Sequence, residues 1–315
     1  MDEFEIIRRY FARASADDSV LLGIGDDAAV LRPEPGRDLV TVLDSLVAGV
    51  HYPHGLTPRD IGYRAVAVNL SDIAAMGGRP RWMTLGLTLH EADSDWIAGF
   101  ASGLFEAADE HGVELVGGDT THGSEVVISV QISGDIEGGR SLKRSGAKHG
   151  DAIYVSGTPG DAAAGLSMLQ SNAPRSAASD YLVSRFTRPE PRLTLGQSLL
   201  ETANAAIDLS DGLFTDLEKL LGASSVAGVI EFDDIPLSTQ ITGLMERPDA
   251  LRFALAGGDD YELCFTASEE RFAGVAELAG VPVRRIGQVT AGSGLSCTRG
   301  GEPYPYSDDG YRHFR

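Results

Sequence analysis

The chain has 315 residues, of which 43% are hydrophobic and 23% charged, a composition typical of a globular protein with a sizeable core. Its net charge is −20, and such a surface repels nucleic-acid phosphates, which argues against a nucleic-acid binder. No run approaches the roughly 20 apolar residues that cross a bilayer. The start Met1–Glu5 is acidic, unlike a secretory signal, so we expect a cytoplasmic protein with no membrane partner.

The first half of the sequence predicts helices alternating with strands. The clearest element is a helix over 58–76, where Ile61, Ala65 and Val68 recur at helical spacing. Pro58 suits its first turn, and the glycines that follow residue 76 suit its end. The other elements expected in this half are a helix at 3–14, strands at 28–31 and 39–42, a strand at 82–89, a helix at 95–110 and a strand at 114–116.

A clear strand at 126–132 closes this half, and two glycine-rich segments follow it, at 134–140 and 144–151. Clusters of this kind mark domain boundaries, so we expect an N-terminal domain over 1–140 and a C-terminal domain over 141–315. The second half predicts strands at 152–155, 206–207, 228–232, 262–266 and 284–289, and helices at 161–169, 194–203, 213–221 and 269–279. The mixture predicts an α/β (mixed α+β) fold, with two sheets favoured over one.

Aspartates recur beside glycines at the ends of predicted strands, which is where oxygen ligands for magnesium could converge. The candidates are Asp26, Asp44, Asp72, Asp119, Asp208, Asp211 and Asp259. A single Gly-Asp pair is more often a turn, and Ser210 or Asp211 would also suit the cap of the following helix. Asn69 and Asp72 share one side of an otherwise apolar helix, where a carboxylate is costly unless it is paired or binds a metal.

Common nucleotide-binding motifs are missing from the sequence. It holds no G-x-x-x-x-G-K-[ST] and no kinase loop of the H-R-D type. Gly23–Ala28 fits a loose G-x-G-x-x-A pattern, but a predicted strand follows it instead of a helix, so we reject a dinucleotide fingerprint. Cys264 and Cys297 have no metal-ligand spacing and are interpreted as small buried residues.

Taken together, the acidic segments resemble the thiamine-monophosphate kinase family. This family is a branch of the superfamily that also holds aminoimidazole-ribonucleotide synthetase and selenophosphate synthetase. The resemblance runs nearly end to end, and the matching segments are 23–28, 46–52, 67–77, 117–121, 144–147, 157–161, 207–213 and 261–265. Any one of them alone would be weak, but their number and order are specific.

The resemblance implies two α/β domains. The N-terminal domain would bind ATP and magnesium and form a barrel across a homodimer, and the C-terminal domain would complete the active-site cleft. It implies direct in-line transfer of the γ-phosphoryl group of ATP to thiamine monophosphate with several Mg²⁺ ions, the last step of thiamine diphosphate biosynthesis, and no covalent nucleophile. The implied magnesium ligands are Asp26, Asp44, Asp72, Asp119, Asp208 and Asp211; the implied ATP contacts are Gly118, Asp119, Arg144 and Ser210; the implied substrate contacts are His51, Asp259 and Tyr311.

The sequence departs from the family at two places. Val42 and Leu43 stand where hydroxyl residues usually precede the aspartate of the second acidic loop, and Asp259 replaces the usual glutamate. One rival function is a sister ATP-dependent enzyme, such as aminoimidazole-ribonucleotide synthetase or a hydrogenase-maturation protein. Selenophosphate synthetase would need an early cysteine or selenocysteine, and no cysteine precedes Cys264. The other rival is an inactive magnesium- and nucleotide-binding module.

Overall fold

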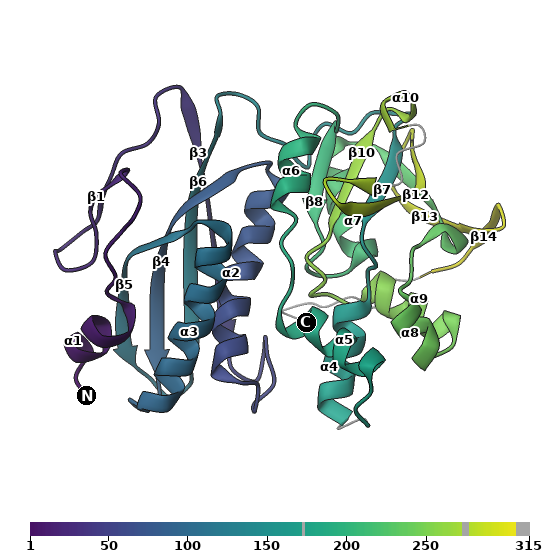
Figure 1. The fold of residues 1–315 in the computed structure, drawn as a ribbon. Helices are drawn as coiled ribbons and strands as arrows, with labels where there is room; N and C mark the ends of the chain where they lie inside the picture. Colours follow the sequence, from purple (N-terminus) through teal and green to yellow (C-terminus); the bar gives the residue numbers. More distant parts are fainter. Residues whose placement is uncertain (172–173, 273–276, 307–315) are drawn as a thin grey trace. The chain divides into compact units, whose positions relative to one another are not determined.

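The computed structural model describes residues 1–171, 174–272 and 277–306 (Figure 1). It divides into two compact units, which we call unit 1 (Met1–Ile73 with Gly78–Arg140) and unit 2 (Ala74–Gly77 with Ser141–Arg315). In the part of the chain that the structure describes, no helix is both long enough and apolar enough to span a membrane.

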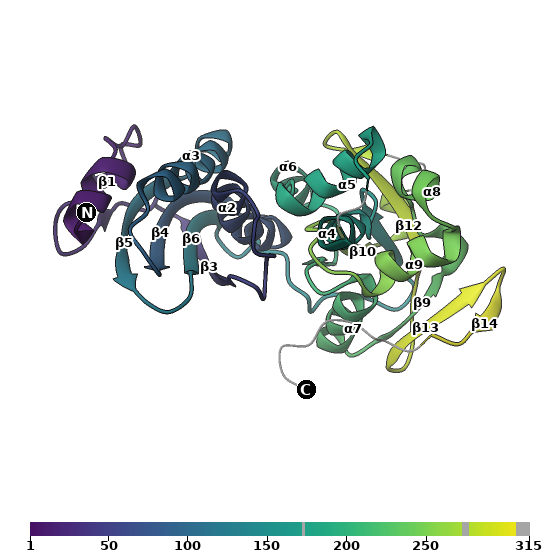
Figure 2. The ribbon, with the colours of Figure 1, turned by 90° about the horizontal axis from the view of Figure 1, so that it is seen from below.

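Unit 1 is built on a four-stranded sheet with the strand order β3-β6-β4-β5, in which only β4 and β5 run parallel. Two helices, α2 and α3, lie on one face of this sheet (Figure 2). A small β1–β2 hairpin stands apart from the sheet. The elements of unit 1 are α1 (Glu3–Ile6), a π-helical turn (Ile7–Phe11), β1 (Val20–Leu22), β2 (Val30–Leu31), β3 (Arg37–Val47), α2 (Pro58–Ala75), β4 (Arg79–Leu89), α3 (Ser94–His111), β5 (Glu114–His122) and β6 (Val127–Glu137).

Glycines allow α2 and α3 to pack with their backbones almost in contact. A Cβ atom on Gly103 would lie 1.7 Å from the carbonyl oxygen of Arg59, and one on Gly62 would lie 2.1 Å from that of Phe100. Any side chain at either position would therefore push the helices apart. The close packing sets the position of α2, and with it the positions of Asn69 and Asp72.

Strand β3 presents an apolar and hydroxyl-rich surface on the face of the sheet opposite to the helices. Side chains alternate along a strand, so Leu39, Thr41, Leu43 and Ser45 point to the same side. All four are exposed, Leu39 by 56% and Leu43 by 61%. This face is an unusual place for large apolar side chains in a unit taken by itself.

Unit 2 contains an eight-stranded sheet with the order β14-β13-β9-β12-β7-β10-β8, and β11 pairs with β12 beside this path. Both faces of its centre are covered: Ile153 and Val155 of β7 join one hydrophobic cluster, and Tyr154 joins another. The strands are β7 (Ala152–Ser156), β8 (Ala205–Asp208), β9 (Ala227–Glu231), β10 (Leu263–Ala267), β11 (Glu277–Leu278), β12 (Val281–Thr290), β13 (Gly294–Arg299) and β14 (Glu302–Tyr304). The helices are α4 (Asp161–Ser171), α5 (Ala177–Thr187), α6 (Leu193–Leu199), α7 (Leu213–Ser224), a 3₁₀ turn (Phe232–Asp234), α8 (Thr239–Leu244), α9 (Arg247–Ala256) and α10 (Glu269–Phe272).

The mixed α/β class expected from the sequence is confirmed. Two expectations about strand ends are wrong, because β3 and β5 continue past residues 42 and 116 and enclose Asp44 and Asp119. Of the described residues in the helix expected at 269–279, Glu269–Phe272 are helical, whereas Glu277–Leu278 form a strand. The sequence reading missed β1, α5, α8, α9, β13 and β14. Closure of a barrel stays a prediction.

Candidate active site

A cavity of about 840 Å³ in unit 1 collects two of the acidic segments singled out from the sequence. One wall is the loop between β1 and β2, residues 23–29, which carries Asp26. The facing wall comes from β4 and from residues 115–120 of β5, which carry Gly118 and Asp119. The structure therefore brings Asp26, Gly118 and Asp119 to one place, as the sequence reading required.

The cavity leaves its carboxylates open to solvent. Asp26 and Asp119 are both exposed, and the backbone N–H of Asp27 donates to Asp26 Oδ1 at 2.9 Å. Gly118 is needed for a different reason: a Cβ atom there would lie 2.0 Å from the carbonyl oxygen of Leu85. The glycine lets β5 approach β4 closely and leaves backbone instead of side chain at the cavity wall.

A second acidic group forms where α2 meets β3. The backbone N–H of Asp44 donates to Asn69 Oδ1 at 3.0 Å, and Asn69 Nδ2 donates to the carbonyl oxygen of Ala65 at 3.0 Å. Asn69 is fully buried, so both ends of its amide are used inside the protein. Asp72 lies one helical turn further along the same side of α2. Asn69 thus joins Asp44 to the helix that carries Asp72.

Side chains alternate between the two faces of the sheet along β3, and this shows on which face Val42 and Leu43 lie relative to Asp44. Leu43 points to the exposed face of the sheet, whereas Val42 and Asp44 point to the helix-covered face. A hydroxyl at position 43 would therefore lie on the other side of the sheet from Asp44. Of these two positions, only Val42 removes a possible ligand from the side of Asp44.

His51 lies just beyond the end of β3. Its Nδ1 accepts from the backbone N–H of Val47 at 3.0 Å, and its own backbone N–H donates to the carbonyl oxygen of Val47 at 3.0 Å. These bonds leave Nε2 as the nitrogen that carries the proton when the ring is neutral. His51 is thereby held as a donor next to the strand that carries Asp44.

In unit 2, two loops bring four predicted site residues together. Asp208 ends β8 and is buried, and Ser210 and Asp211 follow it. The backbone N–H of Asp259 donates to the carbonyl oxygen of Ser210 at 3.0 Å, and that of Tyr261 donates to the carbonyl oxygen of Leu209 at 2.8 Å. Asp259 therefore lies directly beside the Ser210–Asp211 loop.

The loop of Asp259 is held in a strained conformation. Asp259 and Tyr261 have φ angles of +71° and +52°, a region that costs a residue with a Cβ about 1–2 kcal/mol. The hydroxyl of Tyr261 donates to Asp259 Oδ1 at 3.1 Å. Strain of this kind persists where the surroundings hold it, and it is common at binding sites.

Asp216 of α7 supports the other loop and was missed from the sequence. Its Oδ2 accepts from the backbone N–H groups of Ser210 and Asp211, both at 2.9 Å. Lys219 donates to Asp216 Oδ1 at 2.8 Å and to Asp211 Oδ2 at 2.5 Å. Burial raises the pKa of Asp216, although Lys219 opposes the rise. A carboxylate in the apolar run Leu213–Leu217 was the available signal, the same one that drew attention to Asp72.

A buried ion cluster anchors the far end of the Asp259 loop and was also missed. Glu262 is 1% exposed and accepts from Ser156 Oγ, from Arg185 at 2.8 Å and from two nitrogens of Arg192 at 2.7 and 2.5 Å. Burial would raise its pKa, but the two arginines and the hydroxyl outweigh burial, and the pKa is lowered.

Asp260, two residues before Glu262, is also buried but contacts backbone instead of arginine. Its two oxygens accept from the backbone N–H groups of Gly160 and Ala162, at 2.7 and 3.2 Å, at the beginning of α4. Burial raises its pKa well above the usual value. These contacts tie the Asp259 loop to the helix as well as to the ion cluster.

Among the described residues, Arg144 makes no hydrogen bond or ion pair with these loops. Arg144 is exposed in a segment that follows the free edge of β8, where Lys143 O accepts from the backbone N–H of Ala206 at 3.1 Å. Ser224 Oγ donates to the carbonyl oxygen of Arg144 at 2.8 Å. Tyr311 lies outside the described residues.

The acidic groups fit magnesium of the kind found in kinases. Mg²⁺ is usually bound through one or two carboxylates, with waters and substrate phosphates completing its shell. Asp26 and Asp119 offer such a pair of exposed oxygen donors in one cavity. Over residues 1–171, 174–272 and 277–306, no group of three or more His, Cys, Asp or Glu side chains could hold a metal ion without further ligands.

Comparison with known proteins places this geometry in a family. Residues 25–136 match the model of the AIR synthase related protein N-terminal domain, and residues 148–299 match that of the C-terminal domain. The chain is 46% identical to thiamine-monophosphate kinase from Escherichia coli K12, covering 99% of this chain and 98% of that protein.

Two solved structures are also similar. The crystal structure of thiamine-monophosphate kinase from Stenotrophomonas maltophilia K279a has a TM-score of 0.88 at 45% identity, covering 96% of this chain and 98% of that one. The structure of AaThiL complexed with AMPPCP and TMP has a TM-score of 0.81 at 32% identity, covering 92% of each chain. The chain therefore belongs to the thiamine-monophosphate kinase family, within the AIR synthase related proteins.

Proposed function

We infer that this protein is an enzyme that phosphorylates thiamine monophosphate with ATP to give thiamine diphosphate. The observation that carries this inference is the match to thiamine-monophosphate kinases over nearly the whole chain. A relative with the same fold binds AMPPCP, an analogue of ATP, together with TMP. The expectation of a cytoplasmic location stays a prediction.

In unit 1, we propose that the acidic cavity and the second acidic group, formed by Asp44 and Asp72 around Asn69, bind the magnesium that accompanies ATP. Asp26 and Asp119 would supply oxygen ligands from the cavity, and Asp44 and Asp72 from the junction of β3 with α2. The backbone at Gly118 would approach the nucleotide, because no side chain covers it. When bound there, magnesium would offset the negative charge of the phosphates, so that an acidic site could accept anionic substrates.

In unit 2, we propose that the two joined loops hold the phosphates and the acceptor substrate. Asp208 and Asp211 would supply further magnesium ligands, and Ser210 would contact ATP. Asp259 would contact thiamine monophosphate, and His51 and Tyr311 stay predicted substrate contacts. Arg144, exposed and always charged, would bind phosphate oxygens in the bidentate manner of a guanidinium.

The proposed reaction needs no covalent intermediate. An oxygen of the thiamine phosphate forms a bond to the γ-phosphorus of ATP, while the bond from that phosphorus to the β–γ bridging oxygen breaks and ADP leaves. The chain's task is to position the two phosphates in line and to stabilise the charge between them. The hydrogen bonds that hold Ser210, Asp211 and Asp259 support this task, because they fix the loops before substrates arrive.

The direct test is to incubate the protein with ATP, Mg²⁺ and thiamine monophosphate and to follow thiamine diphosphate by chromatography. We expect product from the wild type, a loss of about 10²-fold or more in Asp72→Asn, and no product after chelation of the metal. The matched control is Asp109→Asn, whose carboxylate is 70% exposed on the surface of the same unit. A folded protein that binds ATP but forms no thiamine diphosphate would instead support a sister activity or an inactive binding module.

We also propose that the chain forms a homodimer through the exposed face of β3. Leu39 and Leu43 support this, because large apolar side chains on one sheet face are typical of an interface. In sedimentation experiments, Leu43→Asp should shift the wild-type dimer to a monomer. Leu244→Asp, at a 43% exposed leucine of unit 2, should not. A wild type that sediments as a monomer would refute the proposal.

A further inference from the structure

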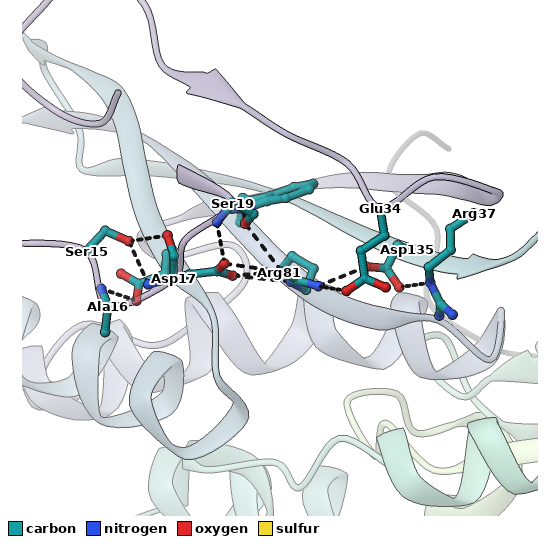
Figure 3. A network of polar contacts seen from close by, with 10 residues as sticks. Ser15, Ala16, Asp17, Ser19, Glu34, Arg37, Arg81 and Asp135 are labelled. Carbon is teal, nitrogen blue, oxygen red and sulfur yellow. Dashed lines mark hydrogen bonds and ion pairs between the residues drawn. The ribbon is translucent and has the colours of Figure 1, made fainter. Parts of the chain in front are cut away.

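A polar network in unit 1 lies outside the cavity and has Arg81 of β4 at its centre. Figure 3 shows this arginine between Asp17 and Ser19 on one side and Glu34 and Asp135 on the other. Its Nη2 donates to Asp17 at 3.0 Å, and its Nη1 donates to Glu34 Oε1 at 2.9 Å and to Asp135 Oδ2 at 3.2 Å. All three guanidinium nitrogens have acceptors, since Nε also reaches Asp17 at 3.3 Å.

Apart from Asp135 of β6, the acceptors of Arg81 flank the β1–β2 hairpin on both sides. Asp17 and Ser19 come just before β1, and Glu34 comes just after β2. Ser19 Oγ also accepts from Trp82 Nε1 at 2.9 Å, and the carbonyl oxygen of Ser19 accepts from the backbone N–H of Arg32 at 2.8 Å. We call residues 17–19 and 32–34 the two feet of the hairpin. A single guanidinium thus binds both feet to β4.

The strands of the hairpin pair with no other described strand. It forms its own two-stranded sheet, and the apolar side chains of Leu21, Leu22 and Val30 are 40–48% exposed. They therefore contribute little packing to the core. Its orientation depends mainly on how its feet are attached.

The tip of the same hairpin carries Asp26. The loop 23–29 forms one wall of the cavity, and Thr84 and Leu85 of β4 contribute to the facing wall. Arg81 lies on that same strand, only a few residues earlier. The chain from Ser19 to Asp26 spans up to about 23 Å, so a small rotation at the feet becomes a large displacement at the tip.

We propose that Arg81 is a positioning residue: by holding both feet of the hairpin on β4, it sets where Asp26 lies in the cavity. Asp135 keeps the guanidinium in place from the far side, because it is 1% exposed and also accepts from Arg37. Lysine cannot replace arginine here, since an ammonium is a point charge without the planar fork that reaches both feet. The part of this proposal that concerns Asp26 as a metal ligand rests on the proposed function.

The test compares Arg81→Lys with the wild type in two measurements that need no turnover. The first is amide hydrogen exchange of the protein without metal or nucleotide. We expect residues 20–31 to exchange about tenfold or more faster in the variant, while β3, β4 and β6 keep their protection. The second is the dissociation constant of Mn²⁺–AMPPCP by calorimetry, which should rise about tenfold.

Two further variants keep the test decisive if Arg81→Lys unfolds. Glu34→Gln and Asp17→Asn each weaken one foot while leaving Arg81 in place, and each should give a smaller increase in hairpin exchange in the same direction. The control is Arg79→Gln, at an exposed side chain two residues earlier on β4, which should change neither measurement.

The proposal is overturned if residues 20–31 exchange at the wild-type rate in these variants. It is also overturned if exchange rises equally throughout unit 1, because Arg81 would then support only the general stability of the sheet. A wild type that does not bind Mn²⁺–AMPPCP would count against the proposed function and the role of Asp26. Hairpin exchange would still decide whether Arg81 holds the feet.

Discussion

In unit 1 the carboxylates of Asp26 and Asp119 are exposed in an open cavity, whereas in unit 2 those of Asp216, Asp260 and Glu262 are buried and hydrogen-bonded on several sides. The exposed pair would receive most of its ligand contacts from outside the protein. The buried set already has its partners: backbone N–H groups, a lysine and two arginines. The comparison separates exposed carboxylates that are proposed to bind a ligand from buried carboxylates that hold loops in place.

This difference predicts how stability and activity respond to substitution. A buried, paired carboxylate leaves unpaired charges behind when it is removed, so its loss is costly to the fold. An exposed carboxylate leaves only water behind, so its loss affects mainly the ligand. Substitutions of the buried carboxylates of unit 2 should therefore lower stability, and those of the exposed carboxylates in the cavity of unit 1 should lower activity alone.

The largest effect is expected for Glu262→Gln. The substitution leaves Arg185 and Arg192 without their shared carboxylate in a buried site and should lower the free energy of unfolding by about 3–5 kcal/mol. Urea denaturation followed by circular dichroism measures the change. Glu190→Gln is the matched control, because Glu190 pairs with the same two arginines but is 65% exposed, and should cost less than about 1 kcal/mol. Equal losses of stability in the two variants would contradict the distinction between buried and exposed carboxylates.

Asp216→Ala should have the next largest effect. It leaves the backbone N–H groups of Ser210 and Asp211 without their acceptor, at a cost of about 1–3 kcal/mol. The loop that carries the proposed ligands would also shift, and a displacement near 1 Å can lower kcat about 10²-fold. Denaturation measures the loss of stability, and steady-state kinetics measures the change in kcat. Glu218→Gln, exposed on the same helix, serves as the control, and an Asp216→Ala enzyme with wild-type kcat would refute the positioning role.

These two cases show how far sequence reasoning reaches. The apolar run around Asp216 carries a visible anomaly, a carboxylate in a buried helix, and the same anomaly drew attention to Asp72, whose role stays a prediction. Glu262 gives no such signal, because its partners Arg185 and Arg192 lie 77 and 70 residues away in the chain. Pairings at that separation come from the fold. The ends of β3 and β5 were misjudged because a glycine or aspartate usually ends a strand, yet here pairing with β6 and β4 carries both strands past Asp44 and Asp119.

The buried carboxylates of Asp260 and Glu262, two residues apart, should also make the stability of the fold change with pH in opposite directions. The pKa of Glu262 is lowered in the folded protein, so its stabilisation is present above about 4.5 and is lost as pH falls through the folded value. The pKa of Asp260 is raised, so its ionisation destabilises the fold as pH rises from about 3.8 through the folded value.

Denaturation of the wild type, Glu262→Gln and Asp260→Asn at pH values above and below 3.8 and 4.5 tests the direction of each change in stability. The wild type's stability advantage over Glu262→Gln should shrink on acidification below pH 4.5, whereas its stability relative to Asp260→Asn should fall as pH rises above 3.8. Parallel trends for the two carboxylates would show that arginine pairing does not distinguish them.

The smallest change in stability is expected for Asp119→Asn, within about 0.5 kcal/mol, because the side chain is exposed at the cavity and its removal leaves no buried charge. Its activity should nevertheless fall about 10²-fold or more at ordinary Mg²⁺ concentrations, since a neutral amide is a weaker ligand for a hard cation than a carboxylate. Raising Mg²⁺ should recover part of the rate if ligation is the cause. Glu125→Gln, an exposed carboxylate in the turn after β5, should change neither stability nor rate. A variant as active as the wild type would remove Asp119 from the ligand set, and one that loses several kcal/mol would show that Asp119 also holds the fold of unit 1.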